Sequence, residues 1–142
     1  MSHDSGIRLF YSSNLPVYKI VDCYLDWGWS LDYQGEISLL PLGDNYNWSS
    51  LKTTEIEKVF DTFRKKSDAH ETIGISLIWK GTDIGVNAHF YSDNSILFSI
   101  LINRKVLDNT EFTDVSWYLP KILMPLSKRN IVVEFIEWRE II

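Results

Sequence analysis

Alternating apolar and polar positions predict several β-strands along this chain. In residues 73–79 and 84–90, apolar side chains alternate with small or polar ones, as expected for strands with one buried face. The segment 96–102 is apolar on almost both faces, so we expect it to lie in the interior of a sheet. Strand-like runs also occur at residues 7–11 and 131–138, near the two ends of the chain.

Two segments have the 3.6-residue period of amphipathic helices. In the first, apolar residues recur between positions 17 and 25; Asn14 is a candidate cap, and Gly28 ends the helix. In the second, which covers residues 113–127, the apolar stripe is interrupted by Pro120. This proline should kink the helix because it removes a backbone donor.

A further helix is predicted between these two. Thr53 or Thr54 would cap it, and its inner stripe consists of Ile56, Val59, Phe60 and Phe63. Its last turn carries the basic cluster Arg64, Lys65 and Lys66. We interpret this cluster as a complement to the negative end of the helix dipole.

A hairpin is predicted after the first helix, because Trp29–Tyr33 and Glu36–Leu40 flank Gln34-Gly35. Residues 41–47 then form a long turn. The complete order of elements is βα ββ α βββ α β with short connections, which predicts a single α+β domain over residues 1–142. We expect a mostly antiparallel sheet of about six to seven strands with three helices.

Composition argues against several classes of protein. A single cysteine, Cys23, excludes an internal disulfide, and none of the three histidines is spaced with a second ligand, so we expect no metal and no cofactor. The N-terminus lacks a signal peptide, and the longest apolar runs have the length of strands, so we expect a cytoplasmic protein that does not cross a membrane. A formal net charge of −5 disfavours binding to nucleic acid.

The negative charge is concentrated in the first third of the chain. Between Lys19 and Lys52 there is no basic residue, and the stretch 22–48 carries five acids and six aromatic residues. Carboxylates accelerate the encounter with a basic partner, and aromatic side chains supply burial energy once it is bound. We therefore predict a partner-binding face with four acids and two aromatic anchors: Asp26, Asp32, Glu36, Asp44, Tyr46 and Trp48. The alternative is that the aromatic residues belong to the core and that the acids only keep the surface soluble.

The sequence contains no recognisable catalytic motif. A nucleophile elbow, a phosphate-binding loop, a dinucleotide-binding fingerprint and a zinc-protease motif are all absent. His89 on a predicted strand near Asp93 could act as a general base, or it could simply neighbour the Asp93-Asn94 turn. We therefore expect a protein that is not an enzyme.

Four segments resemble a known family. The stretch Leu40-Pro41-Leu42-Gly43-Asp44-Asn45-Tyr46-Asn47-Trp48 resembles a pattern found in small immunity proteins encoded beside bacterial polymorphic toxins, including contact-dependent growth inhibition systems. Residues 73–79, 103–105 and 113–119 are similar in style and order, so that the resemblance covers roughly residues 30–140.

The resemblance implies a function by binding. Immunity proteins remain in the cytoplasm and bind a cognate toxin domain tightly, which occludes its active site or blocks access of its substrate. Many such toxins are nucleases with basic surfaces, and an acidic patch would bind there as a nuclease inhibitor. The alternative is a non-enzymatic adaptor domain that binds another protein or a ligand. An enzyme whose site assembles from residues far apart in the sequence is the third possibility.

Overall fold

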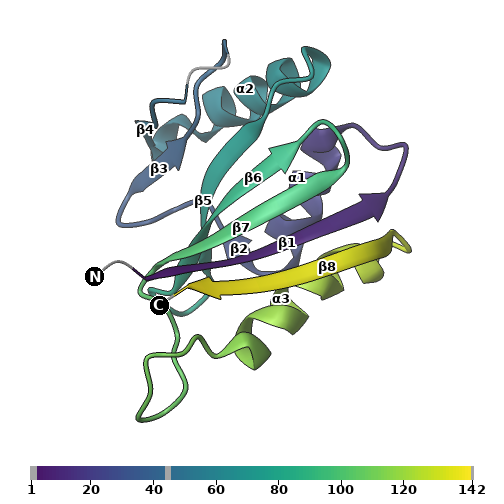
Figure 1. The fold of residues 1–142 in the computed structure, drawn as a ribbon. Coiled ribbons are helices and arrows are strands. Elements are labelled where there is room, and N and C mark those ends of the chain that lie inside the picture. Colours follow the sequence, from purple (N-terminus) through teal and green to yellow (C-terminus); the bar gives the residue numbers. More distant parts are fainter. Residues whose placement is uncertain (1–2, 44–45, 142) are drawn as a thin grey trace.

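A computed structural model of the chain describes residues 3–43 and 46–141. These residues form eight strands, three α-helices and one short 3₁₀-helix (Figure 1). In chain order the elements are β1 (Asp4–Ser12), α1 (Val17–Trp27), β2 (Trp29–Ser30), β3 (Glu36–Leu39), β4 (Ser49–Lys52), η1 (Thr53–Glu55), α2 (Ile56–Asp68), β5 (Ile73–Trp79), β6 (Gly85–Tyr91), β7 (Ser95–Ile102), α3 (Val115–Ser127) and β8 (Val132–Ile141).

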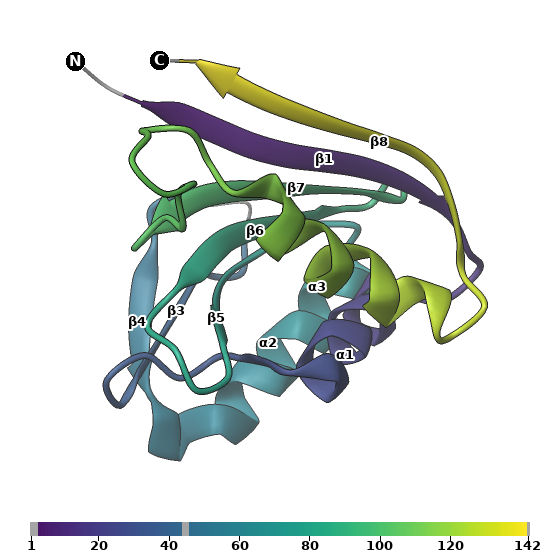
Figure 2. The same ribbon diagram turned by 90° about the horizontal axis from the view of Figure 1, so that it is seen from below.

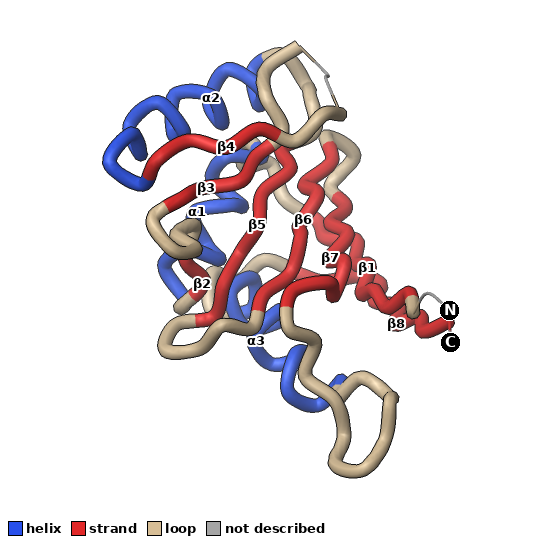
Figure 3. Tube along the Cα trace, turned by 90° about the vertical axis from the view of Figure 1, so that its left-hand side faces the viewer, coloured by secondary structure: helices blue, strands red, loops and turns tan. Residues whose placement is uncertain are grey.

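All strands belong to one antiparallel sheet with the order β4-β3-β5-β6-β7-β1-β8, and the short β2 pairs with β5 beside this path. Figure 3 shows the strands side by side, with the helices on one side of them. The N-terminal strand β1 lies between β7 and the C-terminal strand β8, so both ends of the chain lie at the same corner of the sheet (Figure 1). The predicted α+β class and antiparallel sheet are confirmed.

The hydrophobic core lies between the sheet and the three helices (Figure 2). Every second residue of the central strands points into it and is buried, for example Ile75, Ala88 and Phe98. Tyr24 of α1 connects the layers, because its ring lies 5.4 Å from the ring of Phe98 and its hydroxyl donates to the carbonyl of Ile122 in α3 at 2.8 Å. This packing leaves the opposite face of the sheet without a helical layer.

Two predicted features of the first third differ from the structure. Asn14 does not cap α1, which begins after Pro16 without a side-chain cap. The predicted hairpin is reduced to its turn. Gln34 and Gly35 have positive φ, and Tyr33 and Glu36 on either side exchange two backbone hydrogen bonds of 2.9 and 3.1 Å, but beyond this bridge β2 pairs with β5 and β3 pairs with β4. Tertiary packing explains the change, because the buried Trp29 donates its indole N–H to the carbonyl of Lys121 in α3 at 2.9 Å.

The strand β4 and the 3₁₀-helix η1 were not predicted. The β4 sequence Ser49-Ser50-Leu51-Lys52 has only one apolar residue and therefore little strand signal of its own. Its pairing with β3 gives it an extended conformation. Thr53 belongs to η1 and does not cap α2 with its side chain, because the cap position is Glu55.

The interpretation of the basic cluster 64–66 is wrong for Lys66. This side chain is only 1% exposed, and its ammonium group donates to the carbonyl of Pro41 at 2.8 Å and to that of Leu40 at 3.3 Å. Glu71 lies 3.8 Å away and balances its charge. Lys66 therefore anchors the segment that leaves β3, whereas the neighbouring Lys65 is exposed and pairs with Asp61.

The remaining elements agree with the predictions. The strands β5, β6 and β7 form the predicted meander, and β7 is an interior strand because it pairs with both β6 and β1. The helix α3 continues across Pro120 and buries Tyr118, Ile122 and Leu126, while the kink at Pro120 stays a prediction. Cys23 is buried in α1, and burial raises the pKa of its thiol, which lowers its reactivity.

Candidate functional site

The candidate site lies on the face of the sheet opposite the helices, which we call the open face (Figure 2). Since directly opposite residues of an antiparallel pair share one face, the registers define its composition. One row across the sheet contains small polar residues, namely Ser76, Asn87, Ser99 and Gly6. The adjacent row contains larger side chains, namely His89, Leu97, Arg8 and Glu137. The open face is thus a mixed surface, unlike the apolar face beneath the helices.

Three rings form an aromatic cluster on this face: Trp48, His89 and Tyr91. The Trp48 ring meets the His89 ring edge-on at a centroid distance of 5.6 Å, and the Tyr91 ring lies nearly parallel to the His89 ring at 6.1 Å. Trp48 comes from the segment before β4, whereas the other two residues come from β6. Trp48 remains 39% exposed, so the cluster offers an aromatic surface to the solvent.

A glycine lies beneath the segment that carries Trp48. Gly74 of β5 is directly opposite His89, and a Cβ atom at this position would come within 2.5 Å of the Leu40 side chain. Leu40 therefore occupies the space above Gly74, and its backbone N–H donates to the Gly74 carbonyl at 2.9 Å. This close approach, together with Lys66, guides the chain from β3 onto the open face.

The surroundings of His89 supply no carboxylate partner for a general base among the described residues. Burial lowers the pKa of His89, and its Nδ1 atom is buried without a hydrogen-bond partner among the described residues. The Asp93 carboxylate accepts a hydrogen bond from Ser95 at 2.5 Å. His89 is thus a neutral ring held by two aromatic neighbours, and no described carboxylate orients it.

Tyr46 also lies close to the aromatic cluster. Burial raises the pKa of the Tyr91 hydroxyl, the Arg8 guanidinium lowers it, and the Tyr46 hydroxyl raises it again. Both residues are therefore near enough to influence Tyr91 electrostatically. Tyr46 is itself 70% exposed, so its ring is accessible to a partner.

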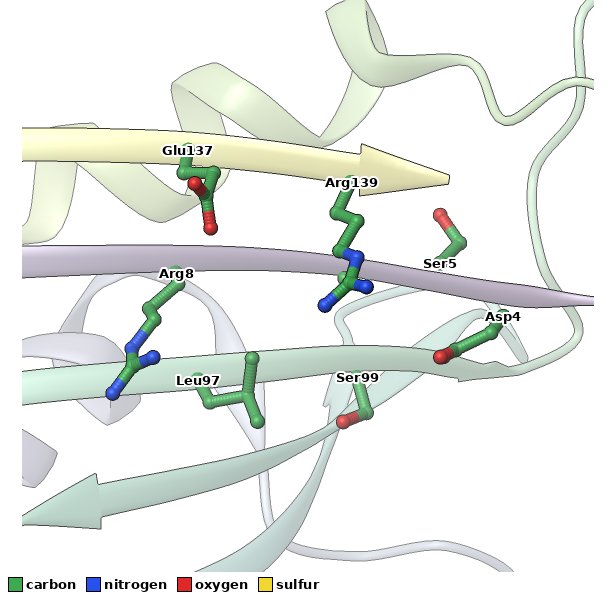
Figure 4. A pocket seen from close by; sticks show the side chains of 8 residues that line it. Asp4, Ser5, Arg8, Leu97, Ser99, Glu137 and Arg139 are labelled. Carbon is green, nitrogen blue, oxygen red and sulfur yellow. The ribbon is translucent and has the colours of Figure 1, made fainter. Parts of the chain in front are cut away.

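A hollow of about 210 Å³ lies on the open face near the edge formed by β1 and β8. Its floor is low because Gly6 has no side chain, and Arg8, Glu137 and Arg139 surround it (Figure 4). Figure 4 shows both guanidinium groups directed to the same side of the sheet as Ser99. Within residues 3–43 and 46–141, neither arginine lies within ion-pair distance of a carboxylate. Both guanidinium groups are therefore available to an external acceptor.

The predicted acids do not gather beside the aromatic cluster. Asp26, in the last turn of α1, pairs with Arg129 after α3. The Asp32 carboxylate accepts from the backbone N–H of Gly35 at 2.9 Å and from the Thr53 hydroxyl, so it stabilises the turn before β3. Both carboxylates thus have a role within the fold, and a partner contact for either stays a prediction.

The other predicted residues divide between two places. Glu36 begins β3 opposite Lys52, whereas Trp48 precedes β4 at the other end of this strand pair, roughly 13 Å away. Asp44 lies outside the described residues. Of the six predicted residues, Tyr46 and Trp48 belong to the open face near the aromatic cluster. Their predicted role as anchors stays a prediction.

Sequence reasoning missed most of the open face. The sequence predicts His89 either as a general base or as a neighbour of the Asp93-Asn94 turn, and it assigns no role to Tyr91, Arg8 or Arg139. The alternation in β6 contained a signal for the aromatic cluster. Its outward-facing positions are Asn87, His89 and Tyr91, so two rings lie next to each other on the sheet surface. The arginines come from β1 and β8, and only the sheet order brings them together.

Other kinds of site find little support among the described residues. No group of three or more His, Cys, Asp or Glu side chains could hold a metal ion in residues 3–43 and 46–141. In the same part of the chain, every helix is too short or too polar to cross a membrane. No protein-family model matches the chain, and no curated protein and no solved structure is significantly similar to it.

Proposed function

We propose that this protein acts by binding another protein on its open face, and that the partner is a toxin domain which it neutralises. The observation that carries the proposal is the aromatic cluster of Trp48, His89 and Tyr91, exposed on a sheet face without a helical layer. Monomeric proteins rarely leave such rings on the surface in a group without using them.

The composition of the open face matches that of protein-binding surfaces. Tryptophan, tyrosine and arginine dominate the binding energy of protein interfaces, and all three lie here: Trp48, Tyr91 and Arg8. The Arg8 guanidinium also lies 5.3 Å from the Phe10 ring, which holds the charge beside an apolar contact surface. A partner can therefore bury rings and offer acceptors to the arginines in one interface.

The size of the hollow favours a protein partner over a small ligand. Small-molecule pockets usually enclose about 300–1,000 Å³. The hollow at Gly6 measures about 210 Å³ and is open to the solvent. A side chain of a partner protein, such as a carboxylate that bridges Arg8 and Arg139, fits this space better than a complete ligand.

The toxin partner is proposed from the resemblance to immunity proteins and from the lopsided charge of the chain. Residues 20–51 contain no base, and the exposed acids Asp26, Asp32 and Glu36 are distributed around the first third of the fold. They would attract a basic nuclease over a distance and raise the association rate. The aromatic cluster and the arginines would then supply the contact surface.

A growth-rescue and binding experiment tests the proposal. The chain is co-expressed with the product of its neighbouring gene as the candidate toxin, and the dissociation constant of the purified pair is measured by calorimetry. Trp48→Ala should weaken binding at least about 30-fold and abolish rescue, because it removes a central aromatic anchor.

Tyr33→Ala is the matched control, because Tyr33 is a ring of 36% exposure outside the aromatic cluster. It should change the dissociation constant less than about twofold. Equal effects of the two variants would contradict the open face as the binding surface. Failure of the wild-type chain to bind the toxin would contradict the proposed partner.

A further inference from the structure

The strand β8 is an exposed edge with unusual length and composition. It has ten residues, pairs on one side only with β1, and contains five large exposed hydrophobic residues: Val132, Phe135, Ile136, Trp138 and Ile141. Trp138 is 46% exposed and Phe135 is 49% exposed. Edge strands of this length usually pair with another chain unless charges, prolines or a cover protect them. The strand β8 has no proline, and its four charged residues are of both signs, so that they can pair across a junction between two strands.

The opposite edge shows how the same sheet protects itself. The strand β4 has only four residues, two of which are serines and one a lysine. It is followed immediately by η1 and α2. A short polar edge of this kind offers little to a second strand. The long, apolar β8 is therefore the edge at which this sheet can be extended.

We propose that two copies of this chain associate through β8, paired antiparallel about a two-fold axis at Trp138. The eight-stranded sheets of the two copies would then form one continuous sheet. The proposal concerns the edge of the sheet and does not depend on the aromatic cluster, although the pairing of Arg139 with the second copy would take this arginine away from a toxin partner.

The register follows from symmetry and charge. In a continuous antiparallel sheet, directly opposite residues point to the same face. A two-fold axis normal to the sheet must therefore place one residue of β8 opposite its own copy, because neighbouring residues point to different faces. An axis at Glu137 or Arg139 sets that charge against its own copy. An axis at Trp138 places Glu137 opposite Arg139 of the second copy, and this pairing occurs twice.

The monomer leaves these two charges free for each other. Among the described residues, neither Glu137 nor Arg139 lies within ion-pair distance of an opposite charge. Glu137 faces Arg8 across the strand pair with β1. In the dimer it would lie between Arg8 of its own copy and Arg139 of the second copy, so that charges alternate across the junction.

The apolar residues fit the same register. Trp138 meets its own copy at the axis, and Phe135 faces Ile141 of the second copy. Ile136 faces Glu140, whose carboxylate accepts hydrogen bonds within its own copy from the Thr113 hydroxyl at 2.7 Å and from the Thr113 backbone. The pairing engages residues 135–141 of each copy, fewer than the about 20–30 residues per side of a standard interface. We therefore expect a dimer that dissociates on dilution.

Reciprocal charge reversal tests the register. The mass of the full chain is measured by sedimentation velocity over a concentration series, with circular dichroism as a check of folding. Wild-type protein should be dimeric at the highest concentrations. Glu137→Arg and Arg139→Glu should each raise the dimer dissociation constant at least tenfold, because each variant sets like charges opposite one another.

An equimolar mixture of these two variants should form a heterodimer, because one copy then carries two arginines and the other two glutamates. The double variant E137R/R139E should form a homodimer again. Glu134→Arg is the matched control, since Glu134 lies on β8 outside the paired residues 135–141 and should leave dimerisation unchanged.

Three results would overturn the proposal. If the wild-type chain is monomeric at every concentration, β8 does not pair with a second copy, and its partner would be a strand of a different protein. Dimers that persist in both single variants would place the interface elsewhere. A mixture of the two variants that stays monomeric would contradict the axis at Trp138. None of these results bears on binding by the aromatic cluster, which Trp48→Ala tests separately.

Discussion

The two faces of the sheet differ in what their side chains do, and β7 shows this within one strand. Phe98 points to the helices, is fully buried and contacts the Tyr24 ring. Its neighbour Leu97 points to the open face, lies opposite His89 and Arg8, and lines the hollow. The helical face holds the fold together, whereas the open face can vary its side chains at small energetic cost and is therefore suited to recognition.

The largest expected effect separates the two faces by stability. Phe98→Ala should lower the free energy of unfolding by about 3–5 kcal/mol, because it leaves a cavity beneath Tyr24. Leu97→Ala should lower it by about 1 kcal/mol, since this side chain is only partly buried. Urea denaturation of both variants measures the difference. Equal losses would show that the open face is as structural as the core.

A second prediction concerns the connection between the faces. Lys66→Met should cost about 2–3 kcal/mol, because it removes the donor to the carbonyls of Leu40 and Pro41 and a charge beside Glu71. Lys65→Met is the matched control, and its exposed pair with Asp61 should contribute less than about 0.5 kcal/mol. Similar denaturation midpoints for the two variants would contradict an anchoring role of Lys66.

The smallest expected effect is a pH dependence from the open face. Burial lowers the pKa of His89 in the folded state, so the unfolded chain binds a proton more readily. The contribution of His89 to stability is therefore complete above about pH 6.5 and decreases as the pH falls below this value. The loss should be a fraction of a kcal/mol, because the ring is half-buried.

His89→Asn provides the comparison for this effect, because it removes the titrating group. Unfolding free energies at pH 5 and pH 7.5 should differ less in this variant than in the wild type. If the unfolding free energy changes between pH 5 and pH 7.5 by the same amount in the variant and in the wild type, His89 titrates alike in the folded and unfolded states. The ring would then remain hydrated within the cluster.

Local patterns predicted those elements whose side chains alternate clearly. Strands β5 to β7 and helix α1 follow from the apolar period of residues 73–102 and 17–27. The strand β4 could not be found in this way, because its extended conformation comes from pairing with β3. The strand pairing predicted beyond the Gln34-Gly35 turn was wrong for a similar reason, since the burial of Trp29 against α3 decides where β2 pairs.

The candidate site shows the same limit more strongly. Composition alone identified Tyr46 and Trp48, because they lie in an aromatic stretch of the sequence. Arg8 and Arg139 are 131 positions apart in the sequence and become neighbours only because β1 lies between β7 and β8. A surface built across strands from different parts of the chain is visible only once the strand order is known.

The indole N–H signal of Trp48 gives the most direct test of the open face as the binding surface. Nitrogen-15 labelled protein is titrated with the toxin domain, and the indole signals are followed by NMR. The signal of Trp48 should shift or broaden, whereas that of Trp29, which is buried against α3, should remain in place. A shift at Trp29 with no change at Trp48 would place the partner on the helical side and contradict the account.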